Sequence, residues 1–401
     1  MTNIENIGIS IMKKIFIFFF LSAYCFAQNN DNYEGLNLSP ELFFGQTFQP
    51  NSWFPKLKSH YMLGISFEKK NSIFKNKWSN TINLSSTGVG LYYSSLGNNE
   101  VVGNAISILP FVEINLNEKE TFSGKFALGT SYFTTQYHPI NNPLNTAVSS
   151  KFTWAFQTFI YYKFRLNNAR SLKVGAGYFH HSNGHTQLPN SGLNTALASF
   201  STSFELNKKL INYDTVDNLT NDSKKYTSFY AFRYGQGIQK FIDHESSVKA
   251  INAIEFKGGV FYMDFLKFSA GITYNFYRHY YDYIKEYKLE PYIENPLLNA
   301  SNVYLSIGIE ALFGNIGIDW EGGLNVYKPF FKEHYLLENE KLDNFYKPKK
   351  LFLGRLGLKL YAINTLKKPK NNFYIGTHIK SNLSQADFTE LSVGFVHRII
   401  N

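Results

Sequence analysis

Alternation of apolar and polar residues constrains the fold of this chain more than any other feature. In the clearest segment, residues 268–276, Phe, Ala, Ile, Tyr and Phe share one face of a predicted strand, while Ser, Gly, Thr and Asn share the other. Segments of about ten alternating residues between polar turns are typical of transmembrane β-barrels, whose strands face lipid and lumen in turn. The sequence predicts about 12 to 16 such strands.

Composition favours a membrane barrel over a soluble β-sandwich. Aromatic residues make up 17% of the 401 residues and charged residues also 17%, whereas a soluble sandwich usually carries more charge. Beyond the N-terminal segment there is no run of about 20 apolar residues, so no helical membrane span is expected. We therefore predict an all-β fold, an antiparallel transmembrane outer-membrane β-barrel, with residues 28–401 as a single barrel domain. A soluble β-sandwich stays the alternative fold.

The N-terminus has the pattern of a secretory signal peptide. Two lysines precede a short apolar run over residues 15–21, and Cys25 and Ala27 are small residues at the −3 and −1 positions of a cleavage site. We expect residues 1–27 to be the signal peptide, with Met12 as a possible true start. Cys25 is the only cysteine, so the mature chain cannot be a disulfide scaffold. The predicted location is the outer membrane of a Gram-negative cell.

The net charge of +10 suits an anionic surface. It identifies no partner by itself, and no nucleic-acid partner is expected. The barrel prediction by itself implies a membrane-embedded protein.

A His and a Ser two residues apart end one of the predicted strands. Residues i and i+2 of a strand share a face, so His180 and Ser182 lie side by side beyond an apolar stripe. The stripe consists of Leu172, Val174, Ala176 and Tyr178, of which the last is expected in an aromatic girdle. A hydroxyl beside an imidazole is the minimum apparatus for an activated serine nucleophile. The stripe places this pair at the membrane interface, pointing at lipid.

The next predicted strand, residues 194–206, supplies a third polar group. Asn194 begins its apolar face, and a hairpin between the two strands brings Asn194 near the Ser182 end of the same surface. The turn before the first strand, residues 166–170, is short, and the connection before that, residues 136–150, is long. Because long loops of such barrels lie on the cell exterior, we expect the three side chains in the outer leaflet.

These residues resemble the signature of the outer membrane phospholipase A family. The match is the run from His180 to Gly184, HHSNG, followed by Asn194 twelve residues after the serine. The resemblance implies a Ser-His-Asn triad that hydrolyses acyl esters of phospholipids in the outer leaflet. Ser182 would be the nucleophile, His180 its base and Asn194 the residue that orients the imidazole, while the Gly184 N–H would bind the oxyanion.

The same resemblance implies a calcium ion and a calcium-dependent homodimer. Its ligands would include the backbone carbonyl of His185 and a side chain at Asn190, where the family has a serine. A carboxamide oxygen is a suitable hard ligand for calcium.

Three other interpretations remain open. The lipid A deacylases, a related barrel family, share the His-x-Ser-Asn run but have a Glu where this chain has Asn194. A non-enzymatic porin or structural barrel would carry the motif only as a strand end. A zinc site at His180, His181 and His185 is disfavoured, because alternation sends the first two side chains to opposite faces.

Overall fold

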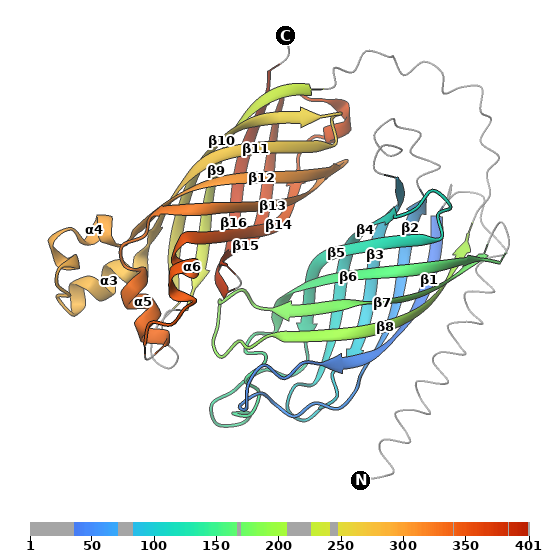
Figure 1. The fold of residues 1–401 in the computed structure, drawn as a ribbon, viewed down its shortest axis with the longest axis horizontal. Helices are drawn as coiled ribbons and strands as arrows, with labels where there is room; N and C mark the ends of the chain where they lie inside the picture. Colours follow the sequence, from blue (N-terminus) through green and yellow to red (C-terminus); the bar gives the residue numbers. More distant parts are fainter. Residues whose placement is uncertain are drawn as a thin grey trace. The chain divides into compact units, whose positions relative to one another are not determined.

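Two closed antiparallel β-barrels make up the described part of the chain (Figure 1). The computed structural model describes residues 36–70, 83–166, 170–206, 226–240, 248–339, 341–383 and 385–399. The predicted signal peptide, residues 1–27, lies outside these ranges. The chain divides into two compact units, each built around one barrel.

The first barrel is drawn from blue to green in Figure 1. Its eight strands are β1 (Leu36–Thr47), β2 (His60–Lys70), β3 (Leu84–Ser95), β4 (Asn104–Asn115), β5 (Phe122–Phe133), β6 (Phe152–Arg165), β7 (Arg170–Ser182) and β8 (Leu193–Glu205). Each strand pairs with the next one in sequence, and β8 pairs with β1 to close the barrel.

The second barrel is drawn from yellow to red. Its eight strands are β9 (Tyr226–Gln239), β10 (Lys249–Tyr262), β11 (Leu266–Tyr277), β12 (Ser301–Phe313), β13 (Ile316–Tyr327), β14 (Phe352–Tyr361), β15 (Asn371–Asn382) and β16 (Gln385–Arg398). Pairing of β16 with β9 closes this barrel. Short helices occupy its longer connections: α3 (Arg278–Glu286), η3 (Tyr292–Glu294), α4 (Pro296–Asn299), α5 (Phe331–Glu338), α6 (Tyr346–Leu351) and η4 (Thr365–Lys367).

The all-β antiparallel barrel predicted from the sequence is confirmed, and the sixteen described strands lie at the upper end of the predicted number. The single barrel domain predicted for residues 28–401 is corrected to two barrels. Alternation tells which side chains face inward, but it does not encode which strand pairs back to β1. That pairing joins Asn37 to Glu205, which closes the first barrel after eight strands.

Charged side chains fill the interior of the first barrel. Lys125 on β5 reaches across to Glu41 on β1, with Nζ and Oε2 3.3 Å apart, and Glu41 also accepts a hydrogen bond from Ser199 on β8. Lys173 on β7 contacts Glu113 on β4 at 2.8 Å. Because the two lysine–glutamate pairs join strands that are not neighbours, they span the lumen. An eight-stranded barrel is just wide enough to be filled by side chains. Buried apolar residues such as Phe43, Phe159 and Phe179 pack beside these ion pairs, so the interior is a packed core of mixed polarity.

The second barrel has a similar interior. Arg355 lies 2.5 Å from Glu321 and 2.8 Å from Glu390, and Arg233 contacts both Glu390 and Glu255. All of these groups are buried. Burial of a charge is costly unless it is paired and hydrogen-bonded, and here each arginine has more than one carboxylate partner.

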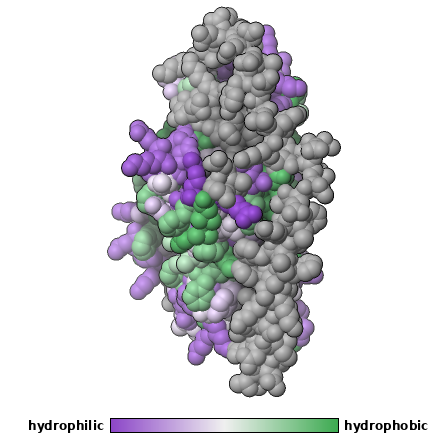
Figure 2. All heavy atoms as spheres, turned by 90° about the vertical axis from the view of Figure 1, so that its right-hand side faces the viewer, coloured by the Kyte–Doolittle hydropathy of each residue, from purple (hydrophilic) through white to green (hydrophobic). Residues whose placement is uncertain are grey.

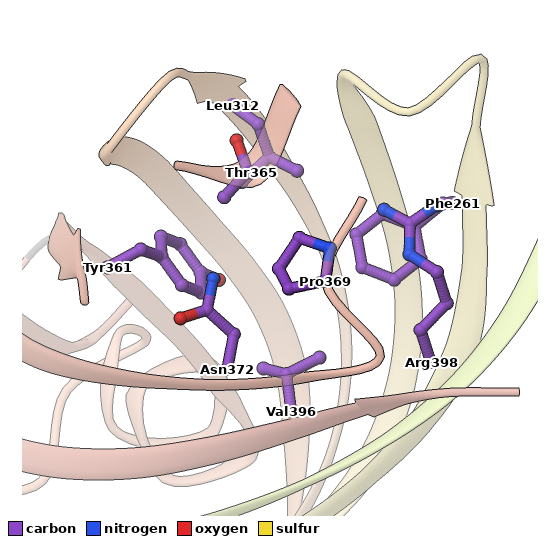
Figure 3. A pocket seen from close by; sticks show the side chains of 8 residues that line it. All are labelled: Phe261, Leu312, Tyr361, Thr365, Pro369, Asn372, Val396 and Arg398. Atoms are coloured by element: carbon purple, nitrogen blue, oxygen red, sulfur yellow. The ribbon is translucent and has the colours of Figure 1, made fainter. Parts of the chain in front are cut away.

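The mouth of the second barrel beside η4 is partly closed by a turn. Thr365 and Pro369 of this turn line a small pocket with Tyr361, Phe261 and Arg398 of the barrel wall (Figure 3). The guanidinium of Arg398 lies 3.8 Å from the centroid of the Phe261 ring. These side chains point inward, so the pocket belongs to the lumen side of the wall.

The outer surfaces of both barrels are apolar. Exposed residues alternate with buried ones along most of the strands, as Val174 and Ala176 do on β7 and as Phe373 and Ile375 do on β15. On the face drawn in Figure 2, hydrophobic side chains gather centrally, with hydrophilic side chains above and below them. An apolar outer band around a polar interior is the pattern of a transmembrane barrel. No helix in the described ranges is both long and apolar enough to cross a membrane.

The interior network predicts a large difference between two substitutions of basic residues. Lys173→Met removes the cation that Glu113 and Glu68 share. Glu113 keeps Lys163 at 2.7 Å, but Glu68 stays buried with the hydroxyl donors Ser39 and Ser86, so we expect the free energy of unfolding to fall by about 3–5 kcal/mol. Arg165→Met is the matched control, because its pair with Glu120 is exposed and should matter by no more than about 1 kcal/mol. Urea unfolding in lipid vesicles measures both. Equal losses would contradict the stabilising role of the network.

Candidate active site

The register between β7 and β8 brings the three predicted residues to one end of the first barrel. His180 lies directly opposite Asn194 in this pairing, and Ser182 is the last residue of β7. Buried Phe179 and His181 face the interior, so His180 and Ser182 point outward as predicted. His181 points inward and His180 outward, so the two imidazoles lie on opposite faces of the strand, as alternation predicts.

His180 and Asn194 are joined by a hydrogen bond. The Nδ1 atom of His180 lies 2.7 Å from Oδ1 of Asn194. A carboxamide oxygen only accepts, so the imidazole donates from Nδ1. In the neutral ring the other nitrogen, Nε2, then carries the lone pair and is available as a base.

Tyr178 is a member of the site that the sequence did not identify. Its hydroxyl donates to the same Oδ1 of Asn194 and lies 3.5 Å from Nδ1 of His180. Its ring is nearly parallel to the imidazole, with an interplanar angle of 12° and centroids 6.2 Å apart. The sequence pattern predicts Tyr178 in an aromatic girdle, not in the site. Its position two residues before His180 on the same face was the signal for this contact.

Ser182 and His180 both lie against the backbone of Gly192. A Cβ atom built on Gly192 would be 3.6 Å from Cε1 of His180 and 3.8 Å from Cβ of Ser182. Gly192 also has a φ of +68°, a region that other residues seldom adopt. Any side chain at this position would therefore be strained. Its Cβ would lie only 2.8 Å from the His181 carbonyl oxygen, and it would be in ordinary van der Waals contact with His180 and Ser182. The sequence pattern predicts only a turn-rich loop here.

An apolar cap holds the backbone around the site. The cap is a cluster of buried residues from the loops and strand ends at this end of the barrel: Phe54, Leu96, Val102, Ala105, Phe133, Ala147, Val148 and Leu193. Leu193 directly precedes Asn194. The loop before β6 also accepts backbone hydrogen bonds from Ser191 at Thr146 and from Gly192 at Ala147, at 3.1 and 3.0 Å. The cap therefore fixes the start of β8.

The loop between β7 and β8 carries the residues predicted for oxyanion and calcium binding. Gly184 and His185 both have positive φ values, 64° and 68°. The Gly184 N–H stays a predicted oxyanion donor. Asn190 Oδ1 accepts a hydrogen bond from the Asn183 N–H at 3.3 Å, and the Asn183 side chain in turn bonds the backbone of Gln187.

This loop fits calcium only in part. Calcium takes six to eight oxygen ligands, whereas the predicted donors are one carbonyl, of His185, and the Asn190 oxygen, which the loop already uses. Among the described residues, no three His, Cys, Asp or Glu side chains are grouped so that they could hold a metal ion. An ion at His185 and Asn190 would therefore need further oxygen ligands.

In the part of the chain that the structure describes, no carboxylate of the ion-pair network in the interior of the first barrel takes part in the site. The buried acidic groups of the first barrel, Glu41, Glu68 and Glu113, bond the interior lysines. The imidazole is thus oriented by a neutral amide and a phenol. This arrangement can hold a base and aim it, but it stabilises a protonated imidazole less than a carboxylate would.

Comparison with known proteins gives one family match, within the first barrel. Residues 62–203 match the model of the lipid A 3-O-deacylase (PagL) family. The matched range runs from β2 to β8 and includes His180, Ser182 and Asn194. The match supports an outer-membrane lipid-modifying ester hydrolase and does not single out the phospholipase predicted from the sequence. A comparison with curated proteins found no match.

Several solved outer-membrane proteins show a distant likeness. CdiB from Acinetobacter baumannii is 8% identical over 92% of this chain, with a TM-score of 0.17, and the chain spans 60% of its length. BamA from Haemophilus ducreyi is 9% identical, with coverage of 91% and 70% and a TM-score of 0.18. The outer membrane protein opdK from Pseudomonas aeruginosa is 6% identical, with coverage of 91% and 98% and a TM-score of 0.22. At such TM-scores they add nothing to the fold described above.

The hydrogen bond to Asn194 predicts the tautomer of His180. We expect Nδ1 to carry the proton in the neutral ring, and Asn194→Ala to reduce that preference because the acceptor is lost. His138 is an internal reference of the opposite kind, since its Nδ1 accepts from the N–H groups of Ile140 and Asn141. Imidazole ¹⁵N chemical shifts report both rings. A His180 spectrum like that of His138 would contradict the geometry.

Proposed function

We propose that the first barrel is an outer-membrane hydrolase that cleaves acyl esters of lipids, with lipid A as its substrate class. The observation that carries this proposal is the hydrogen-bonded pair of His180 and Asn194 beside Ser182, on the outward face of the wall. The family match over residues 62–203 supports the choice of lipid A.

The geometry suggests a two-step acyl transfer. Nε2 of His180 takes the proton of Ser182 while Oγ attacks the ester carbonyl, and the protonated imidazole then gives that proton to the leaving alcohol. Water hydrolyses the resulting acyl-serine with His180 again as base. Asn194 holds Nδ1–H throughout, and Tyr178 fixes the amide by donating to its oxygen. Backbone N–H groups such as that of Gly184 would stabilise the oxyanion, each worth about 3 kcal/mol.

The position of the site fits a substrate that stays in the membrane. The connections at its end of the barrel include residues 48–59 and 134–151, whereas the opposite end includes the shorter connections 116–121 and 166–169. Longer loops lie on the cell exterior in such barrels, which favours the outer leaflet. The ester of a lipid there lies at interface depth, so it need not be extracted.

Phospholipid is the second candidate substrate. Asn194 favours it, because the phospholipase A pattern has an asparagine at this position and the deacylase pattern has a glutamate. Calcium and a homodimer belong to this candidate. Since the described loop supplies few calcium ligands, we propose that the chemistry of one chain proceeds without the ion.

The packed interiors weigh against the porin alternative. Ion pairs such as Lys125 with Glu41 and Arg355 with Glu390 cross or fill the two lumens. A pore requires a water-filled interior, which is found in much wider barrels.

The central prediction concerns Ser182. Ser182→Ala should lower acyl release from lipid A by at least about a thousandfold, because the nucleophile is lost. Ser95→Ala is the matched control: Ser95 ends β3 at the same end of the barrel, on the outward face with Leu91 and Tyr93, and it should keep full activity. The released acyl chains are identified by mass spectrometry.

The same assay with phospholipid vesicles separates the two substrates. The acyl release that depends on Ser182 is compared for the two lipids. If it is larger for phospholipid than for lipid A, a phospholipase replaces the deacylase as the proposed function. If a chelator abolishes this Ser182-dependent release, the enzyme requires calcium. Unchanged lipid A hydrolysis in Ser182→Ala would refute the enzyme.

Substitutions of Asn194 test its orienting role. Asn194→Ala should lower kcat by about tenfold to a hundredfold with little change in KM, because the base is retained but no longer held. Asn194→Glu should keep or exceed the wild-type rate, since a carboxylate accepts from Nδ1–H and also stabilises the imidazolium. Steady-state kinetics on lipid A measure both variants. An Asn194→Glu protein as slow as Asn194→Ala would mean that the amide itself is required.

A further inference from the structure

A second His–Asn pair lies on the outward face of the second barrel. Nδ1 of His397 on β16 and Oδ1 of Asn371 on β15 are 2.7 Å apart, and the two residues are direct partners in the strand pairing. The neighbours Val396 and Arg398 are buried in the interior, so His397 points to the outside. The distance and the pairing match those of His180 and Asn194.

An aromatic ring lies against this imidazole as well. Tyr230 on β9 is the strand partner of His397 on its other side, with ring centroids 4.8 Å apart and an interplanar angle of 22°. Tyr178 has the corresponding place beside His180, although it comes from the same strand. In both barrels, therefore, an amide fixes Nδ1 and a tyrosine ring restricts the imidazole.

A serine completes the arrangement. Ser228 shares the outward face of β9 with Tyr230, and its carbonyl accepts from the N–H of Ile399, two residues beyond His397. Ser228 is thus the diagonal neighbour of His397 across the strand pair. Such diagonal neighbours are about 7–8 Å apart, close to the roughly 6.6 Å between residues i and i+2 of one strand, the spacing of His180 and Ser182.

We propose that Ser228, His397 and Asn371 form a second acyl-ester hydrolase site, which acts on phospholipids. Nε2 of His397 accepts the proton of Ser228 as Oγ bonds to the ester carbonyl carbon. The bond to the lysophospholipid oxygen then breaks, and this oxygen takes the proton from His397. Water attacks the acyl-serine, so that one fatty acid and the free serine are the products. No oxidant or further reactant is needed.

Phospholipid is assigned from the end of the barrel at which these residues lie. This end carries the turns Met263–Phe265 and Gly314–Asn315, whereas the other end carries the helical connections with α3 to α6. Short turns face the periplasm in such barrels, and the leaflet on that side of an outer membrane consists of phospholipid. Exposed Lys367 and Lys370, in the turn that leads into Asn371, suit the headgroup phosphate.

The pocket of Figure 3 is not part of this site. It lies at the same end of the barrel but on the lumen side of the wall, with Val396 and Arg398 in its lining. His397, between these two residues, has the opposite orientation.

Labelling with a fluorophosphonate tests whether Ser228 is activated. The probe transfers its phosphonyl group to a nucleophilic serine with loss of fluoride, and peptide mass spectrometry of the full-length protein finds the labelled residue. We expect label on Ser228 and on Ser182, and none on Ser381, an outward serine at the other end of β15 that bonds the carbonyls of Gly354 and Leu383. His397→Gln should remove the label from Ser228 alone.

The outcomes separate this proposal from that for the first barrel. Ser228 labelled no faster than Ser381 overturns the second site, whatever happens at Ser182. Label on Ser228 without label on Ser182 overturns the first site only. With phospholipid as substrate, the Ser182→Ala variant should still release fatty acid. Adding Ser228→Ala to that variant should lower the release by about a hundredfold or more. No release by Ser182→Ala alone would also overturn the second site.

Discussion

The strand pairing that sets Asn194 opposite His180 is the constraint on which the candidate site depends. A slip of one residue would turn every side chain of β8 to the other face and leave the imidazole without its acceptor. Two features oppose such a slip: Leu193 is buried in the apolar cap, and Lys173 reaches interior carboxylates from the same strand as His180. The geometry of the site is therefore a consequence of how the barrel packs.

Closure after eight strands has a second consequence, because side chains fill most of the interior. The ion pairs of Lys125 with Glu41 and Arg355 with Glu321 occupy the lumens. The outer wall, where the candidate reacting groups meet lipid directly, is therefore the surface on which we propose the chemistry. The His–Asn pair of the second barrel likewise lies on the outer face of the barrel wall.

The sequence predicted what depends on local alternation. The all-β fold and the shared face of His180 and Ser182 need only the period of two, and Asn194 joined them through one hairpin. Features set by distant pairing were missed, namely the closure of β8 on β1 and the meeting of His397 with Tyr230. The donation from Tyr178 to Asn194 was missed as well, although Tyr178 shares a face with His180, because an outward tyrosine at a strand end is ordinarily part of an aromatic girdle.

The most direct measurement of the central claim is detection of an acyl-enzyme on Ser182. The purified full-length protein is mixed with lipid A, quenched in acid within the first turnover and digested for mass spectrometry. We expect the peptide containing Ser182 to gain the mass of one fatty acid minus water, and Asn194→Ala to accumulate this adduct more slowly. Lipid A hydrolysis with no adduct on Ser182, at any quench time, would contradict a serine mechanism at this site.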